Sequence, residues 1–278
     1  MNQKPFFWSN FQRLPSTQRI NSILTAPCLD QTVTDCLSWK PNALEFDTDP
    51  EISIPTNLRL GQQVEKTLIE LIKGSRNYSV IHDGVQIKKD GKTIGELDAI
   101  IRDEENGQLI HLEIAYKFYL LDPSISSDPI KQWIGPNRND TLHEKLHKIK
   151  RKQFPILKTP EVEEMIGKEI TSNCTQALCL MAYLYIPRDS DITMPNNVSH
   201  AVVGHYLTFQ ILVQLDHTSR LYRIPKKTDW GIDPATCVHW FRFDEIQTSL
   251  AKSMDEKRSM LVWEKAGNEY STFFVVWW

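Results

Sequence analysis

The segment from Thr93 to Leu120 constrains the fold most, because its pattern predicts two strands joined by a tight turn. Successive side chains of a strand point to opposite faces of a sheet. In the second strand one face carries His111, Glu113, Ala115, Lys117 and Tyr119, and the other carries Ile110, Leu112, Ile114, Tyr116, Phe118 and Leu120. The Asn106-Gly107 pair favours a hairpin turn, so Glu96 and Asp98 of the first strand come to lie beside the second. The sequence therefore predicts an antiparallel hairpin with an apolar core face and a second face that gathers carboxylates and a lysine.

Two interpretations of the acidic face stay open. Carboxylates that are brought together repel each other, and a fold that does this usually supplies a cation. The alternative is that Glu96, Asp98, Glu113 and Lys117 cover the solvent-exposed side of an antiparallel sheet. The segments before and after the hairpin favour the first interpretation.

The composition is that of an ordinary globular protein, with 41% hydrophobic and 24% charged residues among 278. This length allows one large domain or a core with an appended subdomain. The longest apolar run, Ala177 to Ile186, is too short to cross a bilayer, and the N-terminus lacks the order of a secretory signal. We therefore expect a cytoplasmic protein with no membrane partner. A net charge of −3 excludes a surface coated for bulk nucleic-acid binding, so any such contact must be local.

A helix is expected from about Leu58 to Lys73, with an apolar arc and a polar arc at 100° per residue. Gln63 and Thr67 fall in the polar arc, whereas Glu65 falls inside the apolar one. A carboxylate in that position costs free energy unless something pairs with it. Glu65 is therefore either half of a structural ion pair or a functional group directed at a site.

A second amphipathic helix is expected from about Thr141 to Phe154, with Asn139 or Asp140 as its N-cap. Its apolar stripe consists of Leu142, Leu146 and Ile149, with Gln153 in line and Lys145 and Lys150 on its flanks. Gln153 is either a buried amide that satisfies the core or a group that contacts substrate or water. The basic cluster at residues 148–152 either grips phosphates or forms the solvated face of the helix.

The remaining segments are predicted to be mainly strands. The run from Ala177 to Ile186 is apolar on both faces, which is typical of a central strand, and its position after a helix favours parallel pairing. Further strands are expected at residues 78–82, 85–88, 201–213, 220–224, 260–264 and 272–278, with a helix at about 244–254. The loop at residues 122–139 is long enough to be functional or mobile. We divide the chain into an N-terminal helical segment and connector (1–57), a core (58–190) and a β-rich extension packed on the core (191–278).

Five stretches carry a resemblance to a known superfamily: Leu60 to Glu65, Thr93 to Asp98, His111 to Leu120, Gly135-Pro136-Asn137 and Lys226 to Trp230. The order of a helix with Glu65, a meander with Asp98 and Glu113, a helix and a buried strand is similar to the PD-(D/E)XK nuclease-like superfamily. More closely, the chain resembles a family of bacterial proteins of unknown function assigned to that superfamily. The resemblance implies an α/β (α+β) fold whose restriction-endonuclease-like core runs helix, strand meander, helix and strand around a mixed sheet.

The resemblance also implies a metal site. Asp98 and Glu113 would be the metal-binding carboxylates, the carbonyl of Ile114 a further ligand, and Glu65 an auxiliary acid. Such oxygen ligands suit Mg²⁺ or Mn²⁺. The metal would activate a water that attacks a phosphodiester, with a lysine to orient that water. The implied function is a metal-dependent nuclease that acts on nucleic acid, most simply DNA, with Lys145 and Gln153 as candidate substrate contacts.

The lysine of this chain departs from the superfamily pattern. The expected position, two residues after the glutamate, is Ala115, and Lys117 lies four residues after it. A regular strand separates Glu113 and Lys117 by about 13 Å. Either a bulge shortens the gap, Lys117 reaches back as the catalytic lysine, or another group such as Lys145 replaces it.

The displaced lysine leaves two other functions open. One is a catalytically degenerate nuclease-like module that binds nucleic acid or a protein partner, with no metal and with an ion pair from Glu65 or Glu113 to a lysine. The other is a metal-free enzyme that uses His82, His111 or His205. His111 shares the acidic face and is also a candidate outer ligand of a metal.

Overall fold

The computed structural model describes residues 16–55 and 57–278, and helices and strands alternate along them. The part of the predicted N-terminal helical segment before residue 16 lies outside the described residues. The helices are α1 (Ser16–Leu24), α2 (Gln31–Thr34), α3 (Leu60–Gly74), α4 (Leu142–Lys148), α5 (Phe154–Ile156), α6 (Pro160–Ile166), α7 (Lys168–Asn173), α8 (Asn196–Ser199), α9 (Phe209–Val213) and α10 (Phe243–Asp255). The strands are β1 (Leu37–Ser38), β2 (Tyr78–Lys89), β3 (Lys92–Asp103), β4 (Leu109–Leu121), β5 (Trp133–Ile134), β6 (Thr175–Pro187), β7 (Val202–Thr208), β8 (Arg220–Arg223), β9 (Met260–Ala266) and β10 (Glu269–Val276). Short 3-10 turns are η1 (Pro41–Ala43), η3 (Lys227–Asp229) and η4 (Pro234–Thr236), and η2 (Ile149–Gln153) is a π turn.

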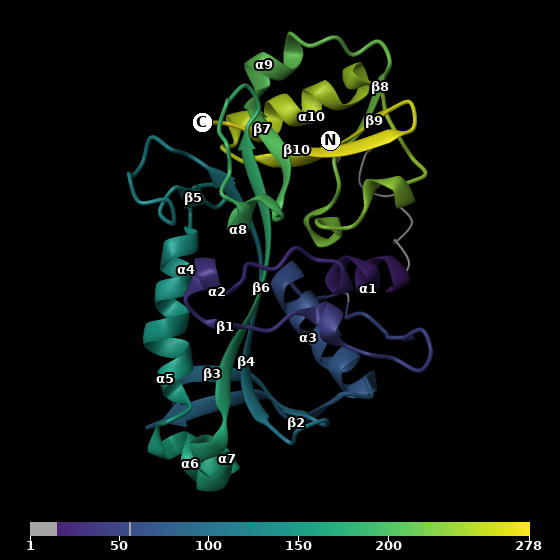
Figure 1. The fold of residues 1–278 in the computed structure, drawn as a ribbon. Coiled ribbons are helices and arrows are strands. Elements are labelled where there is room, and N and C mark those ends of the chain that lie inside the picture. The colour runs from purple at the N-terminus through teal and green to yellow at the C-terminus, as the bar shows by residue number, and fades with distance from the viewer. Residues whose placement is uncertain (1–15, 56) are drawn as a thin grey trace.

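One mixed sheet organises the described part of the molecule (Figure 1). Its main strand order is β2-β3-β4-β6-β7-β10-β9-β8, while β1 pairs with β6 and β5 pairs with β4. Strand β6 runs parallel to β4 over the whole length from Ile110 to Leu120, which confirms a central, parallel strand. The protein is therefore of the mixed α/β class, and the order α3, β2–β3–β4, α4 and β6 is the expected order of its core elements.

The predicted hairpin is confirmed as β3 and β4. Its turn contains Gly107 with φ of 74°, and the Gly107 N–H donates to the Asp103 carbonyl over 2.8 Å. The two strands pair only near this turn, with Ala99 opposite Leu112 as the last pair. Beyond that pair they separate into a fork, which we call the β3–β4 fork, and Asp98 lies at its start.

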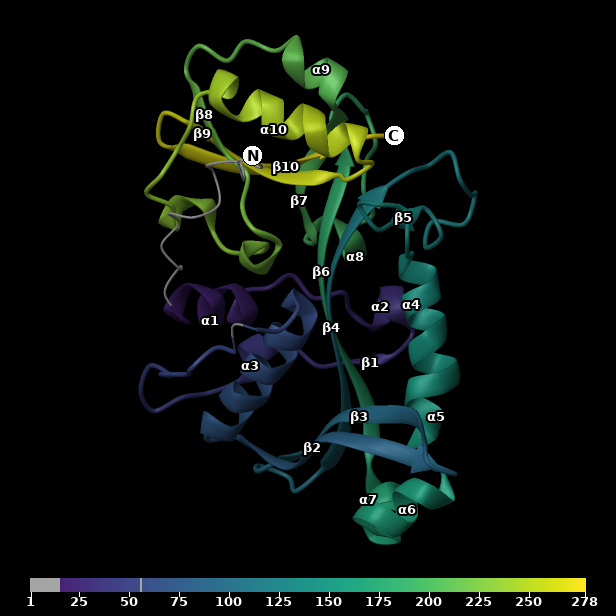
Figure 2. The same cartoon turned by 180° about the vertical axis from the view of Figure 1, so that it is seen from behind.

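Both faces of β4 are buried, because helices cover the sheet on both sides (Figures 1 and 2). The face with Leu112 and Ile114 packs toward α3, as predicted for the core face. The opposite face packs toward α4 and α5, and there the side chains of His111 and Glu113 are 0% and 1% exposed. The interpretation that Glu113 covers a solvent-exposed side is wrong, since the second helix lies over it, whereas Glu96 is exposed as that interpretation expects.

Helix α3 is buried on more of its surface than its polar arc indicates. Gln63 and Thr67, placed in that arc, are 5% and 0% exposed, and the Thr67 hydroxyl is satisfied by the Gln63 carbonyl at 2.7 Å. The physical reason is that α3 contacts α1 and η3 as well as the sheet. Glu65 remains half-buried.

Three local predictions are corrected by the structure. The two predicted strands at 78–82 and 85–88 form one continuous strand, β2, because a bulge near Val80 and His82 absorbs the irregularity. The N-cap of the second helix is Thr141, not Asn139 or Asp140, since Thr141 forms a reciprocal capping box with Glu144. The predicted strand at 201–213 ends as β7 at Thr208, whose side chain caps α9.

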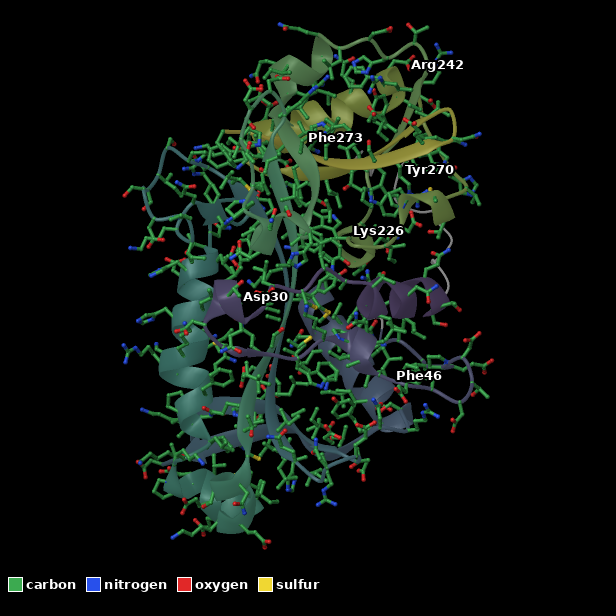
Figure 3. All side chains as sticks on the ribbon, in the orientation of Figure 1. Asp30, Phe46, Lys226, Arg242, Tyr270 and Phe273 are labelled. Atoms are coloured by element: carbon green, nitrogen blue, oxygen red, sulfur yellow. The ribbon has the colours of Figure 1, made fainter. Side chains whose placement is uncertain are left out.

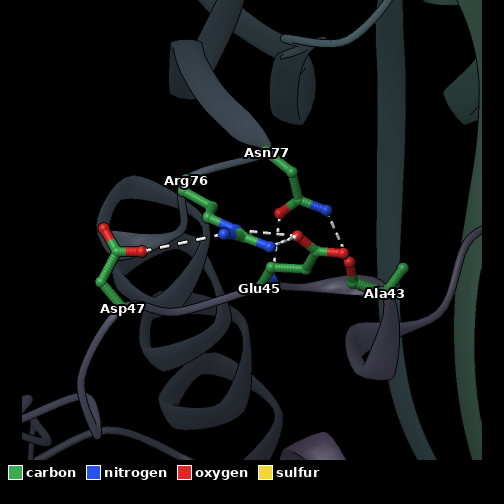
Figure 4. A network of polar contacts seen from close by, with 5 residues as sticks. All are labelled: Ala43, Glu45, Asp47, Arg76 and Asn77. Carbon is green, nitrogen blue, oxygen red and sulfur yellow. Dashed lines mark hydrogen bonds and ion pairs between the residues drawn. The ribbon is translucent and has the colours of Figure 1, made fainter.

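The connector before α3 is fastened to the end of that helix (Figure 4). Arg76 donates from Nε and Nη2 to the Glu45 carboxylate, over 2.8 and 2.6 Å, and Asp47 lies at 4.0 Å from its guanidinium. Asn77 donates to the Ala43 carbonyl over 2.8 Å. These contacts hold the extended, proline-containing segment along the core.

The C-terminal strands continue the main sheet through β7 and β10. Phe273 of β10 is buried in the layer under α10 (Figure 3). The loop at 122–139 contributes to this junction, since Ser259 N–H donates to Asn137 Oδ1 at 2.8 Å and Trp278 Nε1 donates to the Pro136 carbonyl at 3.1 Å. Among the described residues, no helix is both long and apolar enough to cross a bilayer.

Candidate functional site

The β3–β4 fork exposes backbone groups of β4 to the side chain of Asp98. The Ile114 N–H donates to Asp98 Oδ2 over 2.8 Å, in the place where the strand ladder would otherwise continue. In an extended strand the N–H and C=O of one residue point to the same side. The Ile114 carbonyl therefore also faces the fork, next to the half-buried carboxylate of Asp98.

Glu113 lies beside this point with its two carboxylate oxygens in different environments. Gln153 Nε2 donates a hydrogen bond to Glu113 Oε2. Glu113 Oε1 is buried and has no hydrogen-bond partner. Such an orphaned oxygen is unusual, because nearly all buried polar atoms are paired.

A π turn places two polar residues of the second helix over Glu113. Lys145 Nζ donates to Gln153 Oε1 over 3.2 Å. In a regular α-helix residues eight apart are rotated by about 80° from each other. The wider turn of η2 takes up roughly one extra residue, so Lys145 and Gln153 come close to alignment.

Three carboxylates influence each other at the site. Burial is the main cause that raises the pKa of Asp98 to about 7, and the charge of Glu113 adds to it. Burial also raises the pKa of Glu113 to about 7, opposed by Lys145 and reinforced by Glu65. Burial and the charges of Asp98 and Glu96 raise the pKa of Glu65 to about 7 as well. The structure thus brings Glu65, from the other side of the sheet, into the electrostatic field of the hairpin carboxylates.

His111 is neutral at pH 7, because burial lowers its pKa to about 4. Gln176 Nε2 donates to the Phe154 carbonyl over 2.6 Å and lies 3.4 Å from His111 Nδ1. Since an amide N–H only donates, Nδ1 is the acceptor and the imidazole proton is on Nε2. That nitrogen lies 3.2 Å from Glu113 Oε1, although their geometry makes no hydrogen bond.

Sequence reasoning missed Gln176. A signal was available, since Gln176 is a polar residue at the start of an otherwise apolar strand and stands opposite His111 in the β4–β6 register.

Lys117 does not reach the carboxylates of the fork. Its Nζ donates to Asp140 Oδ2 over 2.6 Å, at the start of the second helix. The β4–β6 ladder runs without a bulge through this region, so a bulge does not shorten the gap. Lys145, by contrast, does act on the fork, since its charge lowers the pKa of both Asp98 and Glu113.

Other candidate residues lie further out. Lys148 is exposed and its charge still acts on Glu113, whereas Lys150 pairs with Asp35 at 3.1 Å. His205 stacks on Phe273 in the C-terminal part of the sheet. Within residues 16–55 and 57–278, no group of three or more His, Cys, Asp or Glu side chains is arranged to hold a metal ion. A site made of two carboxylates and a backbone carbonyl contains only two such side chains, so it does not count as a group of three.

Comparison with known proteins gives one family. The chain has no significant match among curated proteins and none among solved structures. A family model described as a domain of unknown function (DUF1853) matches residues 13–276. This match covers nearly the whole sequence, and the chain therefore belongs to the DUF1853 family.

Proposed function

We propose that this protein is a divalent-metal-dependent nuclease with a PD-(D/E)XK-like core. The observation that carries the proposal is the β3–β4 fork, where Asp98 accepts a hydrogen bond from the backbone next to Glu113 and one buried oxygen of Glu113 makes no hydrogen bond. The charge of Glu113 also raises the pKa of Asp98, and the charge of Glu65 raises that of Glu113. A protein rarely keeps such an arrangement for stability alone, because it concentrates like charge in a poorly solvated place. A bound cation would offset the repulsion between the carboxylates and give the unpaired Glu113 oxygen a partner.

The donor set fits Mg²⁺ or Mn²⁺. Glu113 Oε1, the Asp98 carboxylate and the Ile114 carbonyl are all hard oxygen donors, and Asp98 is bonded to the backbone of the residue after Glu113. The remaining positions of such an ion are normally taken by water and by substrate phosphate. When bound, the ion supplies charge neutralisation and lowers the pKa of a bound water.

The residues around the fork have distinct roles in this proposal. Glu113 and Asp98 would hold the ion, and Glu65, whose charge acts on Glu113, would be the auxiliary acid. Lys145 has a pKa lowered by burial, and it supplies a proton donor and a positive charge close to the carboxylates. Gln153 orients Glu113 through its bond to Oε2 and links Lys145 to that carboxylate.

Nucleic acid would approach along the second helix. Lys148, Arg151 and Lys152 are exposed there, and the charge of Lys148 acts on Glu113. Because the chain as a whole has a net charge of −3, these side chains provide the local positive charge that phosphate contact requires.

The test is cleavage of single-stranded, duplex and branched DNA and RNA with and without Mn²⁺. Asp98→Asn and Glu113→Gln should each lower Mn²⁺-dependent cleavage by more than the roughly 10–100-fold cost of losing an outer-shell partner. Glu105→Gln is the matched control, since Glu105 is an exposed carboxylate in the turn of the same hairpin. Cleavage that persists in Glu113→Gln would remove the basis of the proposal.

One observation favours a second candidate, the non-catalytic nuclease-like module. Lys117 lies on the same strand as Glu113 and is the lysine nearest to the position that the superfamily pattern requires. It forms an ion pair with Asp140 instead. Against it, Glu113 has no lysine or arginine nitrogen within 4.0 Å among the described residues, whereas this candidate predicts an ion pair. Wild-type protein that binds nucleic acid equally with and without Mn²⁺, and cleaves none of the substrates, would establish it.

A further inference from the structure

His111 lies beside the Glu113 carboxylate but has no role in the proposed function so far. Its side chain is 0% exposed, and its ring meets the Phe154 ring edge to face, with 5.8 Å between the ring centres. A side chain enclosed in this way contacts neither substrate nor bulk water. Any effect of His111 on the fork therefore passes through the atoms that its two ring nitrogens face.

The Nδ1 side of the ring faces an amide whose orientation is fixed. Gln176 Nε2 donates to the Phe154 carbonyl over 2.6 Å, and a reversed amide would set two oxygens against each other there. The second N–H of this amide nitrogen is left for His111 Nδ1, which lies 3.4 Å away. Because Nδ1 has to accept, it carries no proton, and the ring is a neutral donor through Nε2.

The Nε2 side of the ring faces Glu113 Oε1 at 3.2 Å. This distance suits a hydrogen bond, but the direction of approach makes none, so neither atom has a hydrogen-bond partner among the described residues. A buried donor and a buried acceptor that stay unpaired are costly, and apolar side chains of the same shape would avoid that cost. The pair needs a rotation, and not a displacement, to form the bond.

Both oxygens of Glu113 are reached from the end of the π turn. Gln153 donates directly to Oε2. The next residue, Phe154, acts on Oε1 through Gln176 and His111. The β4–β6 register supports this second path, because it places Gln176 opposite His111. Two neighbouring residues of the second helix thus act on the two ends of one carboxylate.

We propose that His111 is a positioning residue for Glu113, which directs Oε1 toward the fork by donating the Nε2 hydrogen to it. One carboxylate oxygen has two lone pairs, so Oε1 can accept this hydrogen bond and bind a cation at the same time. Outer-shell partners of metal ligands fix the orientation of the ligand in this way. Because Nε2 carries the proton, His111 is not itself a ligand of the ion. The inference rests on the proposed function, since it concerns the metal held by Glu113.

The experiment measures Mn²⁺ binding by the full chain without nucleic acid, from the electron paramagnetic resonance signal of free Mn²⁺. His111→Leu removes the donor and should weaken binding by about 10- to 100-fold, the usual cost of losing an outer-shell partner. His111→Gln places an amide N–H near the position of Nε2 and should recover most of the lost affinity. His205→Leu is the matched control and should bind like wild type, because His205 stacks on Phe273 in the C-terminal part of the sheet.

A second measurement keeps the test decisive if His111→Leu fails to fold. Nitrogen-15 nuclear magnetic resonance of the wild type reports which ring nitrogen of His111 carries the proton, and the signal is assigned by its loss in His111→Gln. We expect the proton on Nε2. A ring with its proton on Nδ1 overturns the proposal, since Nε2 would then have nothing to donate to Glu113.

The outcomes separate this inference from the proposed function. Weaker Mn²⁺ binding in His111→Leu, with recovery in His111→Gln, supports the positioning role. Equal binding in wild type and folded His111→Leu overturns that role and leaves the metal site standing. An equal loss in both His111 variants also overturns it, because a donated N–H would not be what binding requires. Wild-type protein that binds no Mn²⁺ overturns both proposals.

Discussion

The carboxylates of the fork are a cost to folding when no cation is present. Their pKa values of about 7 lie above the ordinary 3.8 of Asp98 and 4.5 of Glu113, chiefly because of burial. The folded state therefore retains protons that the unfolded chain releases between about pH 4 and 7. The stability these groups contribute is present below this range and is lost as the pH rises through 7.

A first prediction follows for the metal-free protein. In a chelator, the thermal midpoint of the wild type should fall between pH 5 and 8, and the double variant Asp98→Asn/Glu113→Gln should show a smaller fall. Each kcal/mol of unfolding free energy corresponds to a shift of about 2–4 °C in the thermal midpoint for a chain of 150–250 residues. Mn²⁺ added in excess of the chelator should raise the thermal midpoint of the wild type at pH 8 and leave that of the double variant unchanged. Identical pH profiles in the chelator would contradict this account of the carboxylates.

A second prediction separates the two lysines. Lys145→Met should lower Mn²⁺-dependent cleavage by about 100-fold or more, the usual scale for loss of a proton-transfer group. Lys117→Met is the matched variant, and it should lower cleavage less than tenfold, since Lys117 serves a part-exposed ion pair with Asp140. Circular dichroism checks that both variants fold. Equal loss in the two variants would contradict the distinct role of Lys145, and a larger loss in Lys117→Met would identify Lys117 as the active lysine.

At the residue scale, sequence reasoning identified the acids more readily than their partners. Strand alternation was enough to put Glu113 and Lys117 on one face, and helix polarity singled out Glu65. The bond from Lys145 to Gln153 depends on a π turn, for which the helical pattern carries no signal. The pairing of Lys117 with Asp140 depends on a loop that closes in three dimensions, which periodicity does not describe.

At the scale of elements, close contact between β7 and β10 makes a third prediction. A side-chain carbon at Gly204 would collide with the Thr272 backbone carbonyl on β10, so Gly204→Ala forces the strands apart. We expect a loss of about 1–3 kcal/mol in unfolding free energy, the usual cost of overpacking. Urea denaturation measures it.

The control for this variant is Gly61→Ala. Gly61 lies in α3 with open space around it, so alanine should be neutral or stabilising there, by up to about 1 kcal/mol. If Gly204→Ala behaves like Gly61→Ala, the β7–β10 contact is looser than described.

Elements were predictable from the sequence where burial alone sets the pattern. The central strand β6, the hairpin and the stripe of α4 all follow from apolar spacing. The sequence predicts one strand at 201–213, because over part of this segment the apolar residues follow the two-residue alternation of a strand. The local hydrogen bond from Ile211 N–H to Thr208 Oγ1, at 3.4 Å, belongs to a helix start, and a cap of this kind competes with the strand pattern.

At the scale of the whole molecule, a buried arginine joins parts of the chain that are far apart in sequence. Arg19 of α1 donates to the Trp230 carbonyl over 3.0 Å, to the Thr228 carbonyl, and to the Tyr116 hydroxyl over 3.3 Å. It thereby connects the N-terminal helix, the central strand β4 and a loop of the C-terminal region. The order of the core elements was predictable, but this closure was not, because no short-range pattern records it.

The central claim is that the fork between β3 and β4 holds one divalent cation. Its most direct test is a crystal of the wild-type protein soaked in Mn²⁺, with anomalous scattering used to locate the metal. We predict one Mn²⁺ ion bounded by the Asp98 and Glu113 carboxylates and the Ile114 carbonyl, and no ion there in Glu113→Gln. An empty fork, with Lys145 Nζ between the two carboxylates in place of the metal, would contradict the account.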